Sequence, residues 1–194
     1  MDLSWWLAPI AGLVLAAACG LRAFLPLLVL GLAARAGLIE LHHGARWMTS
    51  NLALITLASA TVLEILGDKI PVVDHVLDAM GTVVRPGAAW VAAYAVFSAW
   101  PTPWGQLAAV ALGTVAVGVH VAKAKLRLGS TAVTMGAANP LLSLIEDILA
   151  LFAAACAVLA PLAALLALGL LAWFLARRPR RASDGMSDAT SAAR

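Results

Sequence analysis

Charged residues are scarce in this sequence. Only 12% of its 194 residues are Asp, Glu, Lys or Arg, whereas 63% are hydrophobic and the mean hydropathy is +0.95. Because soluble domains are about one quarter charged, an ordinary soluble domain is excluded. The apolar runs also lack the alternation of apolar and polar residues that a membrane β-barrel would show. The composition therefore predicts an all-α, polytopic helical membrane protein whose main partner is the lipid bilayer.

Cysteine is scarce as well, and positive charge is concentrated in one place. The two cysteines, Cys19 and Cys156, each lie inside an apolar run, which favours packing roles over a disulfide or a metal site. The net charge of +3 does not indicate nucleic-acid binding, because four arginines lie together just after the last apolar run. These are Arg177, Arg178, Arg180 and Arg181.

The apolar runs divide the chain into about seven segments, which predicts six or seven transmembrane or re-entrant helices. The runs are 5–19, 23–34, 47–66, 87–100, 106–122, 141–160 and 161–176. The first two form either one long kinked helix or a hairpin of two short helices. We expect residues 1–176 to form a single integral-membrane domain, and residues 177–194 to form a tail that is first basic and then disordered.

The positive-inside rule orients this arrangement. The arginine cluster places the C-terminus in the cytoplasm, which predicts a multi-pass membrane protein with a cytoplasmic C-terminus. Alternation then places the basic segment 123–139 inside and the uncharged turn 101–105 outside. The loop with Arg35 and Arg46 falls outside, against the rule. Similar proline-leucine-leucine triplets at 26–28 and 140–142 suggest a weak inverted repeat of the kind found in transporters.

The segment 64–78 concentrates charge between apolar runs. It carries Lys69, His75 and four acids, which are Glu64, Asp68, Asp74 and Asp78, and Arg85 follows it. Ionisable groups at or near bilayer depth are costly and usually line a pathway or a site. The acids lie four residues apart in pairs, a spacing that would suit a cation or a proton site. An amphipathic helix at the membrane surface, with its acids in water, explains the same pattern.

Other polar residues interrupt the apolar runs. Arg22 lies between the first two runs, and Glu146 and Asp147 lie within the sixth. Arg22 would either bind a substrate anion or form a structural ion pair with Glu64, Glu146 or Asp147. The small-residue stretch 129–140, with Ser130 and Asn139, predicts a broken helix with a polar lining.

Basic residues also end the fifth run. His120, Lys123 and Arg127 share one helical face at its end. We interpret Lys123 and Arg127 as cytoplasmic charges, which could hold an anionic lipid, and expect the deeper His120 to pair with an acid.

Three motifs together resemble a known bacterial family. They are the segment 20–27 (GLRAFLPL), the segment 68–78 with Arg85-Pro86, and the region from Lys123 through Asn139-Pro140 to Glu146-Asp147. In these motifs the chain resembles the integral-membrane family catalogued as domain of unknown function 4126. The resemblance covers nearly the whole chain to about residue 176. It implies an integral membrane protein and supplies no activity and no catalytic residue.

Three functions fit these residues. The first is a small transporter or channel for an ion, a small anion or a lipid head group, which uses carboxylates at broken helices and needs no cofactor beyond a coupling ion such as Na⁺ or H⁺. The second is a membrane-embedded enzyme that acts on lipid phosphates with Mg²⁺. The third is a scaffold subunit without a solute. A chain this small would fit a homodimer.

Overall fold

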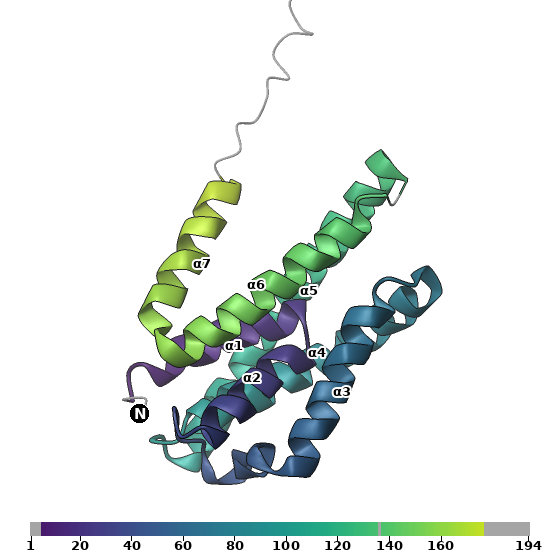
Figure 1. Ribbon diagram of the computed structural model, residues 1–194. Helices are drawn as coiled ribbons and strands as arrows, with labels where there is room; N and C mark the ends of the chain where they lie inside the picture. Colours follow the sequence, from purple (N-terminus) through teal and green to yellow (C-terminus); the bar gives the residue numbers. More distant parts are fainter. Residues whose placement is uncertain (1–4, 136, 177–194) are drawn as a thin grey trace, which may run out of the picture.

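The computed structural model describes residues 5–135 and 137–176, except for some side chains in α4, α5 and α7, and every regular element in these ranges is helical. Figure 1 shows the arrangement. The elements are α1 (Ala8–Leu21), α2 (Phe24–Arg35), the short 3₁₀ helix η1 (His43–Thr49), α3 (Asn51–Gly67), α4 (Pro71–Val96), α5 (Thr102–Thr134), α6 (Asn139–Leu159) and α7 (Pro161–Ala176). The all-α prediction is confirmed. The tail predicted at 177–194 lies outside the described residues.

Two of the described helices, α5 and α6, are long and apolar enough to cross a membrane. A third candidate is the pair η1 and α3, which is bent by 71° between its two parts. Helices α1 and α2 are apolar but have only 14 and 12 residues. At 1.5 Å per residue they measure about 21 and 18 Å, less than the roughly 30 Å of a hydrocarbon core. Two or three candidate spans are therefore present, and the larger count of six or seven is not confirmed.

The first two apolar runs form two helices, which decides between the alternatives left open by the sequence. Arg22 interrupts the helical path, because its backbone is extended (φ −137°, ψ 122°). Helix α1 runs from the N-terminal end towards the middle of the molecule, and α2 runs back (Figure 1). The turn between them therefore lies inside the bundle, where α3, α4, α5 and α6 surround it.

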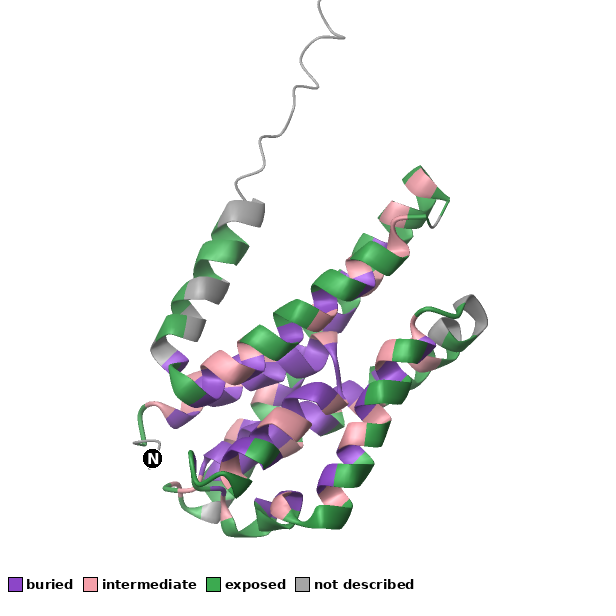
Figure 2. Cartoon of the chain, viewed as in Figure 1, coloured by how far each residue is buried: buried purple, intermediate pink, exposed green. Residues whose placement is uncertain are grey.

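Helix α1 is the centre of the bundle and packs against α4, α5, α6 and α7. Its buried residues are mostly small, and so are those that face it from α4 and α6, such as Ala92 and Ala154. Small side chains allow helices in a membrane to approach closely, which is how such helices gain packing energy without a hydrophobic effect between them. Figure 2 shows buried residues along α1 and exposed ones on the outer helix faces. Large apolar side chains occupy these outer faces, among them Leu52 and Phe152.

Two predicted boundaries are wrong. The fourth apolar run was expected to begin at residue 87, after Arg85-Pro86, but α4 begins at Pro71 and continues through Pro86. A proline inside a membrane helix is tolerated where neighbouring groups satisfy the backbone. The break predicted over 129–140 is also shorter, since α5 extends to Thr134. The Thr134 hydroxyl donates to the Ser130 carbonyl at 2.8 Å, a contact that is compatible with a continuing helix.

The close packing of α1 on α5 yields a stability prediction. A Cβ atom at Gly20 would lie 2.6 Å from Val119 Cβ and 2.8 Å from the Ala116 carbonyl oxygen. Both are rigid neighbours, so Gly20→Ala should lower the free energy of unfolding by about 1–3 kcal/mol. Thermal unfolding of the detergent-solubilised protein would measure the change.

Gly118→Ala is the matched control, because nothing lies within 4 Å of a Cβ at this exposed position in α5. Replacing a helical glycine there should be neutral or stabilising by up to about 1 kcal/mol. Equal effects of the two substitutions would contradict the close contact between α1 and α5.

Candidate functional site

A group of buried charged side chains lies at the turn between α1 and α2. Arg22 is fully buried and pairs with Asp68 at the end of α3 and with Asp147 of α6. Its Nη2 also donates a hydrogen bond to Ser143 Oγ at 2.9 Å. One guanidinium thus joins α3 and α6 to the turn, in a place where an unpaired arginine would be very costly.

Two basic residues of α5 complete the cluster. Arg127 donates to both carboxylate oxygens of Glu146, at 3.3 and 3.0 Å, and to Asp68 at 3.0 Å. Lys123 lies 3.0 Å from the Glu146 carboxylate. We call Arg22, Asp68, Lys123, Arg127, Glu146 and Asp147 the ion-pair network. Its three cations face three carboxylates, so it is neutral as a whole, and several members share partners.

Neighbouring side chains satisfy the two helix ends at the turn. Lys123 Nζ donates to the Leu21 carbonyl at the end of α1 at 3.3 Å. The Glu64 carboxylate of α3 accepts from the backbone N–H groups of Ala23 and Phe24, at 3.0 and 3.3 Å, where α2 begins. A cation thus faces the negative end of one helix dipole, and an anion faces the positive end of the other.

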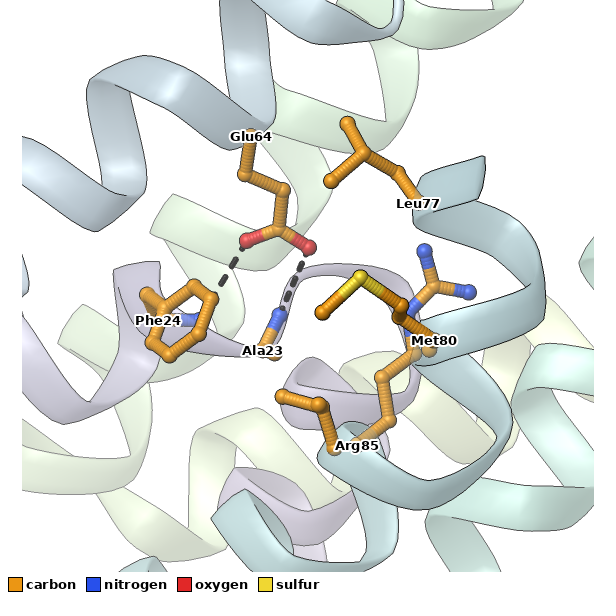
Figure 3. Close-up of a pocket in the computed structure, with 8 residues that line it drawn as sticks. Ala23, Phe24, Glu64, Leu77, Met80 and Arg85 are labelled. Atoms are coloured by element: carbon orange, nitrogen blue, oxygen red, sulfur yellow. Dashed lines mark hydrogen bonds between the residues drawn. The ribbon is translucent and has the colours of Figure 1, made fainter. Parts of the chain in front are cut away.

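A second cluster lies beside the network, on α4 and α5. The Arg85 guanidinium contacts the His120 ring and lies 3.6 Å from the Asp78 carboxylate. Arg85 and Glu64 also line a cavity of about 60 Å³, together with Leu77, Met80 and other residues of α4 and the turn (Figure 3). Arg85 is 1% exposed, and its Nε atom has no hydrogen-bond partner within the described residues.

The structure brings most of the site residues predicted from the sequence to these two clusters. Arg22, Asp68, Glu146 and Asp147 belong to the ion-pair network, and the exposed Lys69 reaches its edge, 3.5 Å from Ser143. Glu64 and Arg85 line the cavity, and Asp78 pairs with Arg85. The side chains of Asp74 and His75 lie outside the described residues.

Ser130 and Asn139 lie elsewhere, at the turn between α5 and α6. The Asn139 amide donates to Thr131 Oγ1 at 3.0 Å, and no contact described in the structure joins either residue to the network. Asn139 thus joins the start of α6 to the end of α5, and the carbonyl of Ser130 accepts a hydrogen bond from Thr134 of its own helix.

The interpretation of two α5 residues was wrong. Lys123 and Arg127 are not exposed cytoplasmic charges, because they are only 4% and 6% exposed within the network. His120 was expected to pair with an acid; its ring contacts Arg85 and also lies within electrostatic range of Asp78. The spacing 120, 123, 127 already placed these residues on one face, and that face is the buried one. Ser143, which the sequence analysis missed, lies one turn before Glu146 and Asp147.

No three His, Cys, Asp or Glu side chains gather in a metal-binding arrangement within the part of the chain that the structure describes. The basic groups of the network could instead hold an anion, and its carboxylates a proton or a monovalent cation, once partners exchange.

Comparison with known protein families places this site in context. Residues 10–181 match the family described as Domain of unknown function (DUF4126). The chain belongs to this family. The match covers both clusters and, apart from the first two residues of α1, all seven α-helices, so the resemblance noted in the sequence is confirmed. Neither the curated proteins nor the solved structures contain a match to this chain. The function must therefore be argued from the site itself.

The shared partners in the network predict a specific pattern of stabilities. Lys123→Met leaves one carboxylate in excess, and Glu146→Leu leaves one cation in excess. Each should lower the free energy of unfolding by about 3 kcal/mol, because an uncompensated charge stays buried. The double variant restores the balance and should cost clearly less than the sum of the two, as a double-mutant cycle in thermal or denaturant unfolding would measure.

Lys125→Met provides the control, since Lys125 lies on the same helix but is exposed. Its effect should stay within about 0.5 kcal/mol. Additive losses in the double variant would show that the buried charges do not act as one network.

Proposed function

We propose that this protein is a small membrane transporter or channel in which the solute passes the turn between α1 and α2, with the ion-pair network as its gate. The observation that carries this proposal is the meeting of two helix ends and six charged side chains in one place, all of them buried except the partly buried Asp147. Discontinuous helices whose ends point at a buried polar site are characteristic of transporters. A bundle that served only as a scaffold would need neither feature.

The depth of the network supports this proposal. Trp5, Trp100 and Trp104 surround an open groove at the end of the molecule where α1 and α5 begin, and tryptophan is typical of the membrane–water interface. From that end, Ala8 to Arg22 spans about 21 Å of helix, and Trp104 to Lys123 spans about 28 Å. The network would then lie in the far third of a roughly 30 Å hydrocarbon core. A pathway from the tryptophan end would have to cross most of the bilayer beside α1 and α2 to reach it.

Shared partners would allow the network to rearrange without leaving a charge alone. Arg127 bridges Asp68 and Glu146, and Glu146 in turn binds Lys123. If a solute takes one of these partners, the abandoned group still has another within reach. Such exchange has a low cost compared with separating an isolated buried pair, which would cost about 3–5 kcal/mol.

The orientation with a cytoplasmic C-terminus in a bacterial inner membrane belongs to the same proposal. The α5–α6 connection and the turn between α3 and α4 lie at the end opposite the tryptophan groove (Figure 1), and two lysines, Lys69 in the α3–α4 turn and Lys125 in the second half of α5, belong to these elements. Both are exposed and suit an anionic lipid surface on the cytoplasmic side. A homodimer remains a prediction from the size of the chain.

Arg22→Lys tests the gate. The substitution keeps the charge but removes the fork geometry that joins Asp68, Asp147 and Ser143. We expect flux to change at least about tenfold, which corresponds to about 1.4 kcal/mol of altered interaction. The purified protein would be placed in vesicles of phosphatidylethanolamine and phosphatidylglycerol. Separate gradients of protons, Na⁺, K⁺, chloride and phosphate, and a fluorescent lipid that reports flip between leaflets, would cover the three solute classes.

Arg35→Lys is the matched control, because Arg35 is exposed at the opposite end of α2 and contacts Thr49 and Asn51. It should conduct like the parent. If the parent moves none of these probes while Arg22→Lys merely unfolds more easily, the network is structural and the transport proposal fails.

A further inference from the structure

Asp147 is the most loosely held carboxylate of the ion-pair network. Among the described residues it pairs with one cation, Arg22, whereas Asp68 and Glu146 each pair with two. Its side chain is also 13% exposed, against 1% for Asp68 and 8% for Glu146. The Asp147 carboxylate can therefore leave the network at a lower cost than the other two, because less of its charge is buried and fewer partners are lost.

The contact between Arg22 and Asp147 balances charge without a well-formed hydrogen bond. Arg22 Nε and Asp147 Oδ1 form the ion pair, yet neither atom has a hydrogen-bond partner within the described residues. Arg22 is fully buried, so its Nε–H group is a buried donor that lacks an aligned acceptor. An oxyanion that is not tied to a helix can align with the guanidinium, which presents its donors in a fixed fork.

Lys69 provides an alternative partner for Asp147. It lies exposed in the turn between α3 and α4, and its ammonium is within electrostatic range of Asp147. Its Nζ lies 3.5 Å from the Oγ of the buried Ser143, which accepts from Arg22 Nη2 at 2.9 Å. Ser143 and Asp147 are four residues apart on α6 and share one face of that helix. This face thus lies against one buried cation and one exposed cation.

The charges around this face favour an anion over a cation. The ion-pair network is neutral, and no ion pair of Lys69 occurs within the described residues, so the network and Lys69 together carry one positive charge in excess. Glu64 does not enter this balance, because its carboxylate binds the backbone N–H groups of Ala23 and Phe24. A solute anion would complete the pairing, whereas a cation would add to the excess.

We propose that the solute is a small oxyanion, with a carboxylate or a phosphate group, which replaces Asp147 on Arg22 while Asp147 moves to Lys69. Two ion pairs then stand where one stood before, and each charge keeps a partner throughout the exchange. Because Lys69 lies at the end opposite the tryptophan groove, the anion reaches the gate from that end (Figure 1). The inference rests on the proposed transport function and names its solute class.

Equilibrium dialysis of the full chain in a neutral detergent tests the site without any flux. The probes are radiolabelled phosphate and acetate at constant ionic strength. Asp147→Asn keeps the shape of the side chain and removes the competing charge. We expect this variant to bind at least one of the two probes at least about tenfold more tightly than the parent, because Arg22 no longer has to release Asp147 first.

Lys69→Gln tests the second half of the exchange, and it should leave the fold intact because Lys69 is exposed. It should weaken binding of the same probe about fivefold, the typical contribution of an exposed ion pair, since Asp147 then has no cation to receive it. Glu40→Gln and Arg46→Gln are the matched controls, because each removes one exposed charge in the connection between α2 and α3. Both should bind like the parent.

A further arm distinguishes a free anion from a lipid head group. Crosslinking of a photoactivatable phosphatidylglycerol is measured at increasing mole fraction in the same micelles, with the same variants. If the expected order of affinities appears with phosphate or acetate, the site takes a free anion, and if it appears with the lipid alone, the oxyanion is a head group. The oxyanion site is overturned if Asp147→Asn binds none of the three probes more tightly than the parent, or if Lys69→Gln binds them as the parent does.

Flux into vesicles separates this inference from the transport proposal. If the order of affinities appears and none of the probes moves across the membrane, the transport proposal fails and the oxyanion site stands. If protons, Na⁺ or K⁺ move in a way that depends on Arg22, while phosphate, acetate and the lipid do not move, transport stands and the oxyanion is not the solute.

Discussion

The rest of the structure depends on one constraint, which is that the backbone ends at the turn between α1 and α2 cannot reach bulk water. Every polar backbone group inside a bilayer must be satisfied by the protein, because each unpaired group costs several kcal/mol. Glu64 supplies the acceptor that α2 lacks at its start, and Lys123 supplies the donor at the end of α1. Since each is itself a charge in apolar surroundings, its charge must be compensated as well. The cations pair with carboxylates from other helices, and these pairs form the ion-pair network.

The network explains why distant parts of the chain must be present together. Arg22 joins the turn to α3 and α6, and Arg127 joins α5 to the same two helices. Removing α3, α5 or α6 would leave a buried charge of the network unpaired, and the desolvation cost of such a charge is larger than the gain from most packing contacts. Neutrality therefore belongs to the assembled bundle and not to any single pair. Glu64 is the exception, because backbone dipoles and not a cation hold it.

The sequence predicts the fold class and the charged residues at the centre of the bundle better than it predicts which of these residues pair with each other. Arg22, Glu146 and Asp147 could be recognised because a charge inside an apolar run has few explanations. Lys123 and Arg127 could not be separated from ordinary cytoplasmic charges, since the positive-inside rule accounts for them equally well until the true length of α5 is known. The segment boundary at Pro86 was also predicted wrongly. A proline usually ends a helix, and only the surrounding helices show that here it does not.

Packing and charge divide the molecule into a rigid part and a part that can change. Along α1 the contacts are between small residues at close range, such as Gly20 against Val119, and sliding this helix would disturb all of them at once. At its end the contacts are ion pairs with alternative partners. A change confined to the turn thus costs less than a movement of the whole helix. In the proposed transporter, opening at the turn would therefore be the less costly way to gate a pathway, with α1 as the fixed frame on which the turn moves.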